Sequence, residues 1–83
     1  MRNDIITILE QLNAFYCEPA EGVIYVSVYE GEETEGLIAL YNAICAASTT
    51  GWQAFLNAWG EPTGREVCTL QGLTIEWEWE SLE

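Results

Sequence analysis

The sequence predicts an α+β domain in which about three helices pack against a three-stranded antiparallel sheet, in the order α-β-α-α-β-β. Two kinds of periodicity support this prediction. In three stretches apolar residues return every three or four positions, as on one face of a helix. In three others they alternate or form short β-branched runs, as in strands. The 83 residues contain no repeat and no long linker, so we expect a single acidic α+β domain spanning residues 1–83.

The first helix is expected from about Asp4 to Phe15, with Asn3 as its N-cap. Asp4 places a negative charge in the first turn, where the helix dipole favours it. Residues 17–22 then break the helical pattern, because Pro19 disfavours helical backbone at the residue before it.

The second helix is expected over Leu37–Ala47, with Thr34 as its cap. A third helix is expected to start at Thr50, which forms a capping box with Gln53 three residues later. Gly60 then ends it. The apolar face of this third helix would consist of Trp52, Phe55, Leu56 and Trp59. Core packing is the commoner explanation for such a stripe, and an interface is the alternative.

Two strands are expected before the end of the chain. Val23–Tyr29 is rich in β-branched and aromatic residues, and Arg65–Leu70 alternates more weakly. Gln71 and Gly72 then form a tight hairpin turn into the closing strand, since glycine supplies the positive φ that such turns require.

The last eleven residues, 73–83, carry the clearest strand pattern. Successive side chains on a strand point to opposite faces, so alternation divides this stretch into two sets. The apolar set is Leu73, Ile75, Trp77 and Trp79, and the polar set is Thr74, Glu76, Glu78 and Glu80. Same-face residues lie roughly 6.5–7 Å apart, a spacing close to that of phosphates along an extended nucleic-acid strand. We expect hydrated carboxylates along a solvent-facing strand edge.

The charge balance excludes several functions. The chain has fourteen acidic residues, two arginines, no lysine and no histidine, for a net charge of −12. Contacts to phosphate need Lys and Arg, so direct binding to nucleic acid or to an anionic membrane is not expected. Without histidine the commonest general base is missing, and we expect no enzyme activity. Simple solubility, or a halophilic source, is the plain alternative explanation of the acidity.

No cofactor, metal or membrane span is expected. The three cysteines, Cys17, Cys45 and Cys68, form no CxxC pair, so buried free thiols are expected rather than a zinc site or disulfides. The acidic stretch 30–36 lacks the ligand spacing of a calcium loop. No apolar run is long enough to cross a membrane, and no signal peptide is evident, so we expect a cytoplasmic protein.

These features predict a basic partner. An anionic surface attracts a positively charged groove at long range, and such grooves chiefly hold DNA or RNA. We expect the partner-binding residues to be glutamates of the closing strand, joined by those after Val23–Tyr29 if that strand lies beside the hairpin. They are Glu76, Glu78, Glu80, Glu30, Glu32, Glu33 and Glu35.

In its size, acidity, α+β layout and glutamate-studded strand, Glu76-Trp77-Glu78-Trp79-Glu80, the chain resembles the small phage-encoded inhibitors called anti-CRISPR proteins. The resemblance is one of general character and rests on no shared motif. It implies a phage inhibitor that works in the cytoplasm of a bacterial host. Such an inhibitor binds a CRISPR effector protein or complex and blocks the site of its target DNA or guide RNA.

Two alternatives stay open. An immunity or antitoxin protein that neutralises a basic toxin would share the electrostatics. A structural or assembly module that self-associates through aromatic faces would use its acidity only for solubility. The chain is expected to act as a monomer or a small homo-oligomer.

Overall fold

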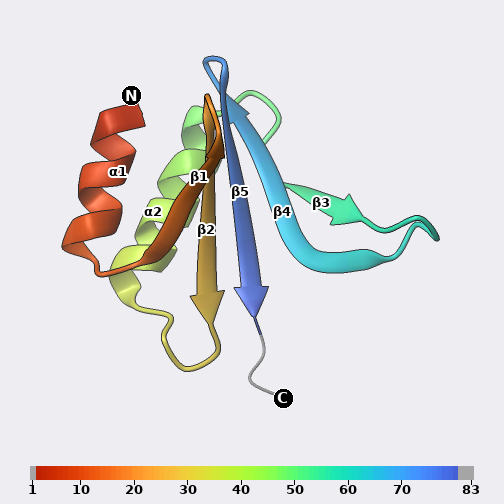
Figure 1. Cartoon of the computed structure of the whole chain (residues 1–83), viewed down its shortest axis with the longest axis horizontal. Coiled ribbons are helices and arrows are strands. Elements are labelled where there is room, and N and C mark those ends of the chain that lie inside the picture. Colours follow the sequence, from red (N-terminus) through yellow and green to blue (C-terminus); the bar gives the residue numbers. More distant parts are fainter. Residues whose placement is uncertain (1, 81–83) are drawn as a thin grey trace.

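Two helices and five strands make up residues 2–80, the part of the chain that the computed structural model describes (Figure 1). They are α1 (Arg2–Gln11), β1 (Phe15–Ala20), β2 (Val23–Tyr29), α2 (Glu35–Ala47), β3 (Gln53–Leu56), β4 (Pro62–Leu70) and β5 (Leu73–Glu80). The end of the alternating stretch, residues 81–83, lies outside the described part.

The strands form one mixed sheet in the order β1-β2-β5-β4-β3. β2 and β5 run parallel at its centre, and the other three neighbouring pairs are antiparallel. The expected three-stranded antiparallel sheet with three helices is therefore wrong. The parallel pair arises because the chain crosses the sheet through α2 after β2, and parallel strands need such a long connection.

The start of the chain differs from expectation in two ways: its helix is shorter, and an unexpected strand follows it. α1 ends at Gln11 and not at Phe15, because Asn13 adopts the left-handed backbone conformation, with φ of 56°. Phe15 then begins β1, which pairs with β2. The segment that was expected only to break the helix is thus largely a strand. Pro19 is tolerated there because β1 lies at the edge of the sheet.

The expected third helix does not form within the described chain, and β3 takes part of its place. Trp52 turns inward and stacks on Tyr41, with ring centroids 4.8 Å apart, and its indole N–H donates to the Tyr41 carbonyl. Phe55, Leu56 and Trp59 instead stay exposed, at 49%, 51% and 83% of their surface. The helix-like spacing was misleading because only one of these four residues packs inward.

Other expectations are confirmed. β2 has the bounds that were expected, and Thr34 caps α2 by accepting a hydrogen bond from the Leu37 N–H at 3.2 Å. In the β4–β5 turn both Gln71 and Gly72 have positive φ, at 49° and 84°. Two positive φ values are the pattern of a type I′ hairpin turn.

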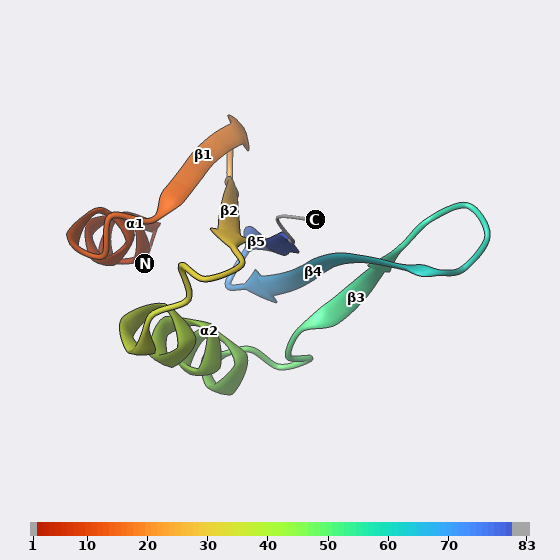
Figure 2. The same cartoon turned by 90° about the horizontal axis from the view of Figure 1, so that it is seen from below.

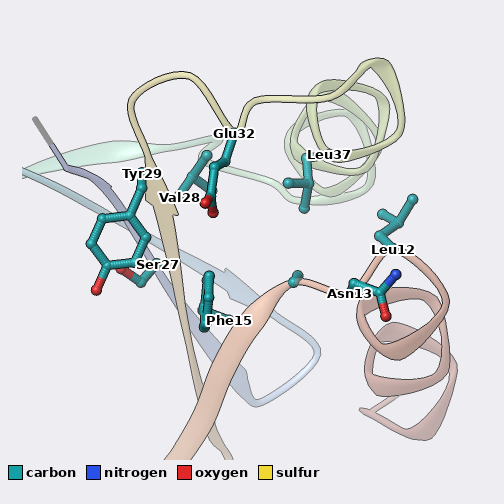
Figure 3. A pocket seen from close by; sticks show the side chains of 9 residues that line it. Leu12, Asn13, Phe15, Ser27, Val28, Tyr29, Glu32 and Leu37 are labelled. Atoms are coloured by element: carbon teal, nitrogen blue, oxygen red, sulfur yellow. The ribbon is translucent and has the colours of Figure 1, made fainter. Parts of the chain in front are cut away.

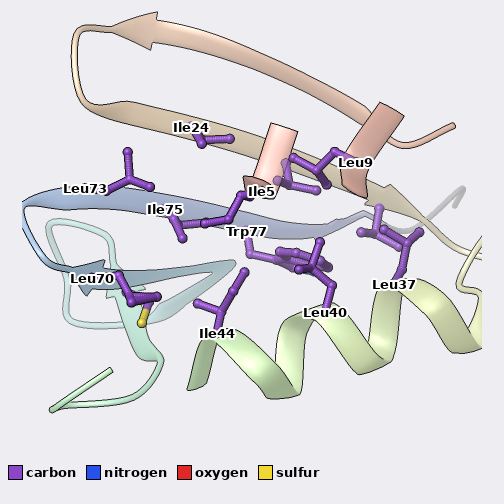
Figure 4. Close-up of a cluster of buried hydrophobic side chains, with 13 residues drawn as sticks. Ile5, Leu9, Ile24, Leu37, Leu40, Ile44, Leu70, Leu73, Ile75 and Trp77 are labelled. Carbon is purple, nitrogen blue, oxygen red and sulfur yellow. The ribbon is translucent and has the colours of Figure 1, made fainter. Parts of the chain in front are cut away.

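Both helices cover the same face of the sheet (Figure 2). The apolar side of β5 enters the core against them as expected, with Trp77 at its centre (Figure 4). Complete burial of a large apolar side chain contributes about 1.5–3 kcal/mol. The buried core consists of Ile5, Leu9, Ile24, Val26, Val28, Leu37, Leu40, Ile44, Cys68, Leu70, Leu73, Ile75 and Trp77.

The three cysteines are all free thiols, but only Cys68 is buried. Cys17 and Cys45 are exposed, so the expectation that all three are buried is wrong for two of them. Cys68 is buried because β4 directs it to the helix-covered face, opposite Ile75 of β5.

Replacing Trp77 with Ala should lower the free energy of unfolding by about 3–5 kcal/mol, since it removes the largest buried side chain and leaves a cavity. Trp77→Phe should cost less, because the indole N–H of Trp77 has no hydrogen-bond partner among the described residues. Urea unfolding followed by far-UV circular dichroism measures both. Trp59→Ala, at a site 83% exposed, is the matched control and should change stability by less than about 0.5 kcal/mol. Equal losses at the two positions would contradict this packing.

Candidate functional site

The sheet face opposite the helices, called the open face here, holds three of the seven expected binding residues, Glu76, Glu78 and Glu80. Directly opposite residues on neighbouring strands project to the same side of a sheet, so the strand register defines this face. Its central side chains are Tyr25, Ser27 and Tyr29 of β2, Glu76, Glu78 and Glu80 of β5, and Arg65 and Val67 of β4. Phe15 and Cys17 of β1 extend it. The open face is therefore a mixed surface of carboxylates and aromatic rings.

The three glutamates of β5 lie in the expected row, but they are not fully hydrated. β5 is an interior strand, flanked by β2 and β4. Only 25% of the Glu76 side chain and 22% of the Glu78 side chain are exposed. The expectation of hydrated carboxylates on a strand edge is wrong, because the neighbouring strands cover much of their surface.

Arg65 bridges two of these carboxylates. Its Nη1 lies 3.2 Å from Glu76 Oε1, and its Nη2 lies 3.1 Å from Glu78 Oε1. The guanidinium carbon also lies 4.8 Å from the centre of the Tyr25 ring, within cation–π distance. Two carboxylates thus share one positive charge, and the row keeps part of its negative charge at this point.

Hydroxyl groups from β2 hold the other side of the row. The Tyr25 hydroxyl donates to the Glu78 carboxylate, and the Ser27 hydroxyl donates to that of Glu80. The hydrogen bond from Tyr25, together with Arg65, lowers the pKa of Glu78 below its usual 4.5, although partial burial opposes this. Burial and the same hydrogen bond raise the pKa of Tyr25. A carboxyl group with a lowered pKa keeps its charge and is a poor proton donor.

The carboxyl ends of β2 and β5 meet at one edge of the sheet, because the two strands are parallel. The Glu30 N–H, just after β2, donates to the Glu80 carbonyl at 2.7 Å. The side chains of Glu30, Glu33 and Glu80 line a shallow hollow with Trp79. We call these three glutamates the acidic end. They come together because β2 lies beside β5, which was the stated condition for Glu30 and Glu33 to join the row, and because the two strands run parallel, which was not expected.

Glu32 and Glu35 lie apart from this hollow. Glu35 occupies the first turn of α2, where the helix dipole favours a negative charge. Glu32 lines a different small hollow, whose aromatic wall is formed by Phe15 and Tyr29 with ring centroids 5.5 Å apart (Figure 3). Leu37 of α2 also lines it. The expected set of seven glutamates is therefore divided among the row, the acidic end, this hollow and the start of α2.

Glu66 is a partly buried carboxylate that the sequence analysis did not single out. It lies on the helix-covered side of β4 and accepts hydrogen bonds from the Tyr41 hydroxyl at 2.7 Å and from the Trp79 indole N–H at 3.0 Å. Burial and the neighbouring carboxylate raise the pKa of Tyr41. A signal was present, since Glu66 alternates in phase with the buried Cys68.

Both arginines of the chain are engaged in intramolecular ion pairs. Arg2 forms a two-pronged contact with Glu18, with the shortest nitrogen–oxygen distance 2.6 Å. Arg65 holds Glu76 and Glu78. Both guanidinium groups are thus already paired with carboxylates, so neither is available alone to bind a phosphate group. The surface of the protein carries mainly negative charge.

Two other kinds of site are not found in residues 2–80. No cluster of three or more acidic, cysteine or histidine side chains in this range is arranged to hold a metal ion. None of its helices has the length and apolar character needed to cross a membrane.

Comparison of the chain with protein-family models, with curated proteins and with solved structures found no match.

Glu78→Gln tests the stabilisation of the row by its neighbours. Since the folded-state pKa of Glu78 lies below 4.5, the ionised group contributes stability above that pH and loses the contribution as the pH falls through the lowered value. We expect the variant to be less stable by about 1 kcal/mol near neutral pH, and the difference from wild type to shrink in acid. Urea unfolding at a series of pH values measures this.

The matched control is Glu21→Gln, which removes one exposed carboxylate at the β1–β2 turn. It corrects for the general relief of charge repulsion and should change stability by less than about 0.5 kcal/mol. A Glu78→Gln deficit that stays constant into acid would contradict the assigned role of Tyr25 and Arg65.

Proposed function

We propose that the protein is an acidic inhibitor that mimics nucleic acid and blocks the basic nucleic-acid groove of a nuclease, with a CRISPR effector as the first target to test. The observation that carries the proposal is the acidic end, where Glu30, Glu33 and Glu80 gather beside a row of carboxylates held by Tyr25, Ser27 and Arg65. Such a target places the site of action in the cytoplasm of a bacterial host.

The held row supports the proposal through its low entropy cost. Binding normally costs about 0.5–1.5 kcal/mol for each flexible side chain that becomes fixed at an interface. Glu78 and Glu80 already accept hydrogen bonds from β2, and Glu76 is already paired with Arg65. Their negative charges therefore occupy defined positions along β5 before a partner arrives, as phosphates do along a nucleic-acid strand.

The uneven neutralisation assigns different roles to the glutamates. Glu76 and Glu78 share Arg65, so they contribute less net charge than their number suggests. Glu33 and Glu80 take no part in the ion pairs that the two arginines form within residues 2–80. We assign the main electrostatic contact to the acidic end and a positioning role to Glu76 and Glu78.

The aromatic rings of the open face supply apolar anchors beside the charges. Exposed salt bridges contribute only about 0–1 kcal/mol each, so carboxylates alone give weak binding. Phe15 is 56% exposed and packs edge-on against Tyr29 near the acidic end. A cationic groove lined by Arg or Lys side chains can place guanidinium or ammonium groups against such rings.

The test begins with affinity capture from a bacterial lysate, followed by mass spectrometry and purification of the captured protein. Glu33→Gln with Glu80→Gln should weaken its binding about tenfold at low salt, through the loss of two interfacial charges. The matched control is Glu10→Gln with Glu21→Gln, two exposed carboxylates elsewhere, which should weaken binding only slightly. The variant that combines Glu76→Gln with Glu78→Gln should lose more affinity than the control and less than the Glu33/Glu80 variant.

Binding is measured over a salt series, and the captured protein is also tested for binding to DNA and RNA. Wild-type protein should displace the nucleic acid, and its affinity should fall as salt rises. A captured partner that binds no nucleic acid would sink the proposal. Unchanged affinity and salt slope in the Glu33/Glu80 variant would also do so.

A further inference from the structure

A hairpin projects from the body of the molecule, as both views show (Figures 1 and 2). It consists of β3, the connecting turn and the start of β4, and we call residues 53–64 the arm. Its turn is ordered by hydrogen bonds: the Asn57 N–H donates to the Glu61 carbonyl at 2.9 Å, and the Thr63 hydroxyl donates to the Phe55 carbonyl at 2.7 Å. The arm is thus a built element with defined internal contacts.

The arm presents apolar surface to solvent. Phe55, Leu56 and Trp59 are among the large apolar side chains that are most exposed, and Trp59 at the tip reaches 83%. Scattered apolar residues on a surface need no explanation, but these three lie within five residues of one projecting hairpin. We take this exposed apolar segment as a candidate interaction surface.

The edge of the arm is also open to strand pairing. β3 is an edge strand and pairs only with β4 within residues 2–80. The opposite edge strand, β1, is protected by Pro19, by an irregular register after Cys17 and by the Arg2–Glu18 ion pair. Prolines, bulges and charges are the usual features that prevent edge-to-edge pairing. The four residues of β3 contain none of them beyond a local irregularity in the pairing with β4.

The distribution of charge along the chain indicates which kind of partner binds to the arm. The segment 51–64 carries a single ionisable side chain, Glu61, whereas the whole chain carries −12. A basic partner is attracted to the acidic end and the row, not to this nearly neutral arm. A second copy of the chain is repelled by most of the acidic surface, but residues 36–60, in α2 and the arm, carry no charged side chain. Of these two elements the arm is the one with an open strand edge, so two copies can pair there with little repulsion.

We propose that two copies of the chain associate through the arm, with β3 of one pairing antiparallel to β3 of the other about a two-fold axis. A register centred between Ala54 and Phe55 sets each Phe55 opposite Ala54 of the partner subunit. It also carries Trp59 past the start of the second β3, so that part of its exposed ring is covered. The two sheets become continuous, and the acidic ends stay outside the contact.

The dimer should respond to salt in the opposite way to the inhibitor complex. Each copy is highly acidic, and at physiological ionic strength charges are screened beyond about 8 Å. Added salt therefore reduces the repulsion between copies while leaving apolar contacts and strand pairing intact. Added salt weakens binding to a basic groove but strengthens association of two copies. The two proposals therefore give opposite results in a salt series, and one can fail without the other.

Sedimentation equilibrium from low micromolar to millimolar protein, at low and high salt, tests the dimer. The mass should rise toward twice the monomer value of 9.3 kDa, and the dissociation constant should fall several-fold at high salt. Leu56→Lys with Trp59→Ser should abolish association, since lysine on an edge strand opposes pairing. The control Ile38→Lys, on an exposed apolar residue of α2, should dimerise like wild type.

Amide hydrogen exchange provides a second measurement that does not depend on variants. Protection of the β3 amides, residues 53–56, should increase with protein concentration. A chain that stays monomeric at millimolar concentration and high salt would overturn the proposal, as would a dimer unaffected by the arm variant or one without concentration-dependent protection of β3.

Discussion

The parallel pairing of β2 with β5 is the constraint on which the rest of the structure depends. It places the two central strands so that their apolar sides form the middle of the core and their polar sides form the middle of the open face. It also brings the carboxyl ends of both strands to one edge, where Glu80 meets Glu30. An antiparallel arrangement of the same strands would send these two glutamates to opposite ends of the sheet. The gathering of negative charge at this edge therefore follows from the direction of the two central strands.

The sequence pattern predicted correctly those elements whose apolar spacing matches the side that is buried in the fold. The alternation of β5 identified its buried side, and the β-branched run of β2 identified its bounds. The expected third helix is wrong because Trp52, Phe55, Leu56 and Trp59 follow a helical spacing, yet only Trp52 packs inward and the other three remain exposed. β1 was missed because Pro19 argues against a central strand, but not against an edge strand. Strand order could not be predicted, since it depends on contacts between segments far apart in the chain.

The candidate site was predicted in composition but not in organisation. The glutamate row lies on one face, as the alternation required, yet its neighbours were invisible without the register. Arg65 pairs with Glu76 and Glu78 only because β4 and β5 form a hairpin and place Arg65 opposite Glu78. That contact changes the meaning of the row. With Arg65 bound, the row has a smaller net negative charge, and its carboxylates are held in fixed positions. More of the unneutralised charge then lies in the loop after β2.

The distance along the chain between the central strands has a consequence for biosynthesis. Tyr25 of β2 and Glu78 of β5 contact each other across 53 positions. At typical rates of translation, β5 leaves the ribosome roughly 3–10 s after β2. During that interval the β1–β2 hairpin carries an apolar edge with no neighbour to complete it, and this is the period in which a nascent chain is most open to wrong pairing and to chaperones. The same strand that completes the core thus determines when folding can finish.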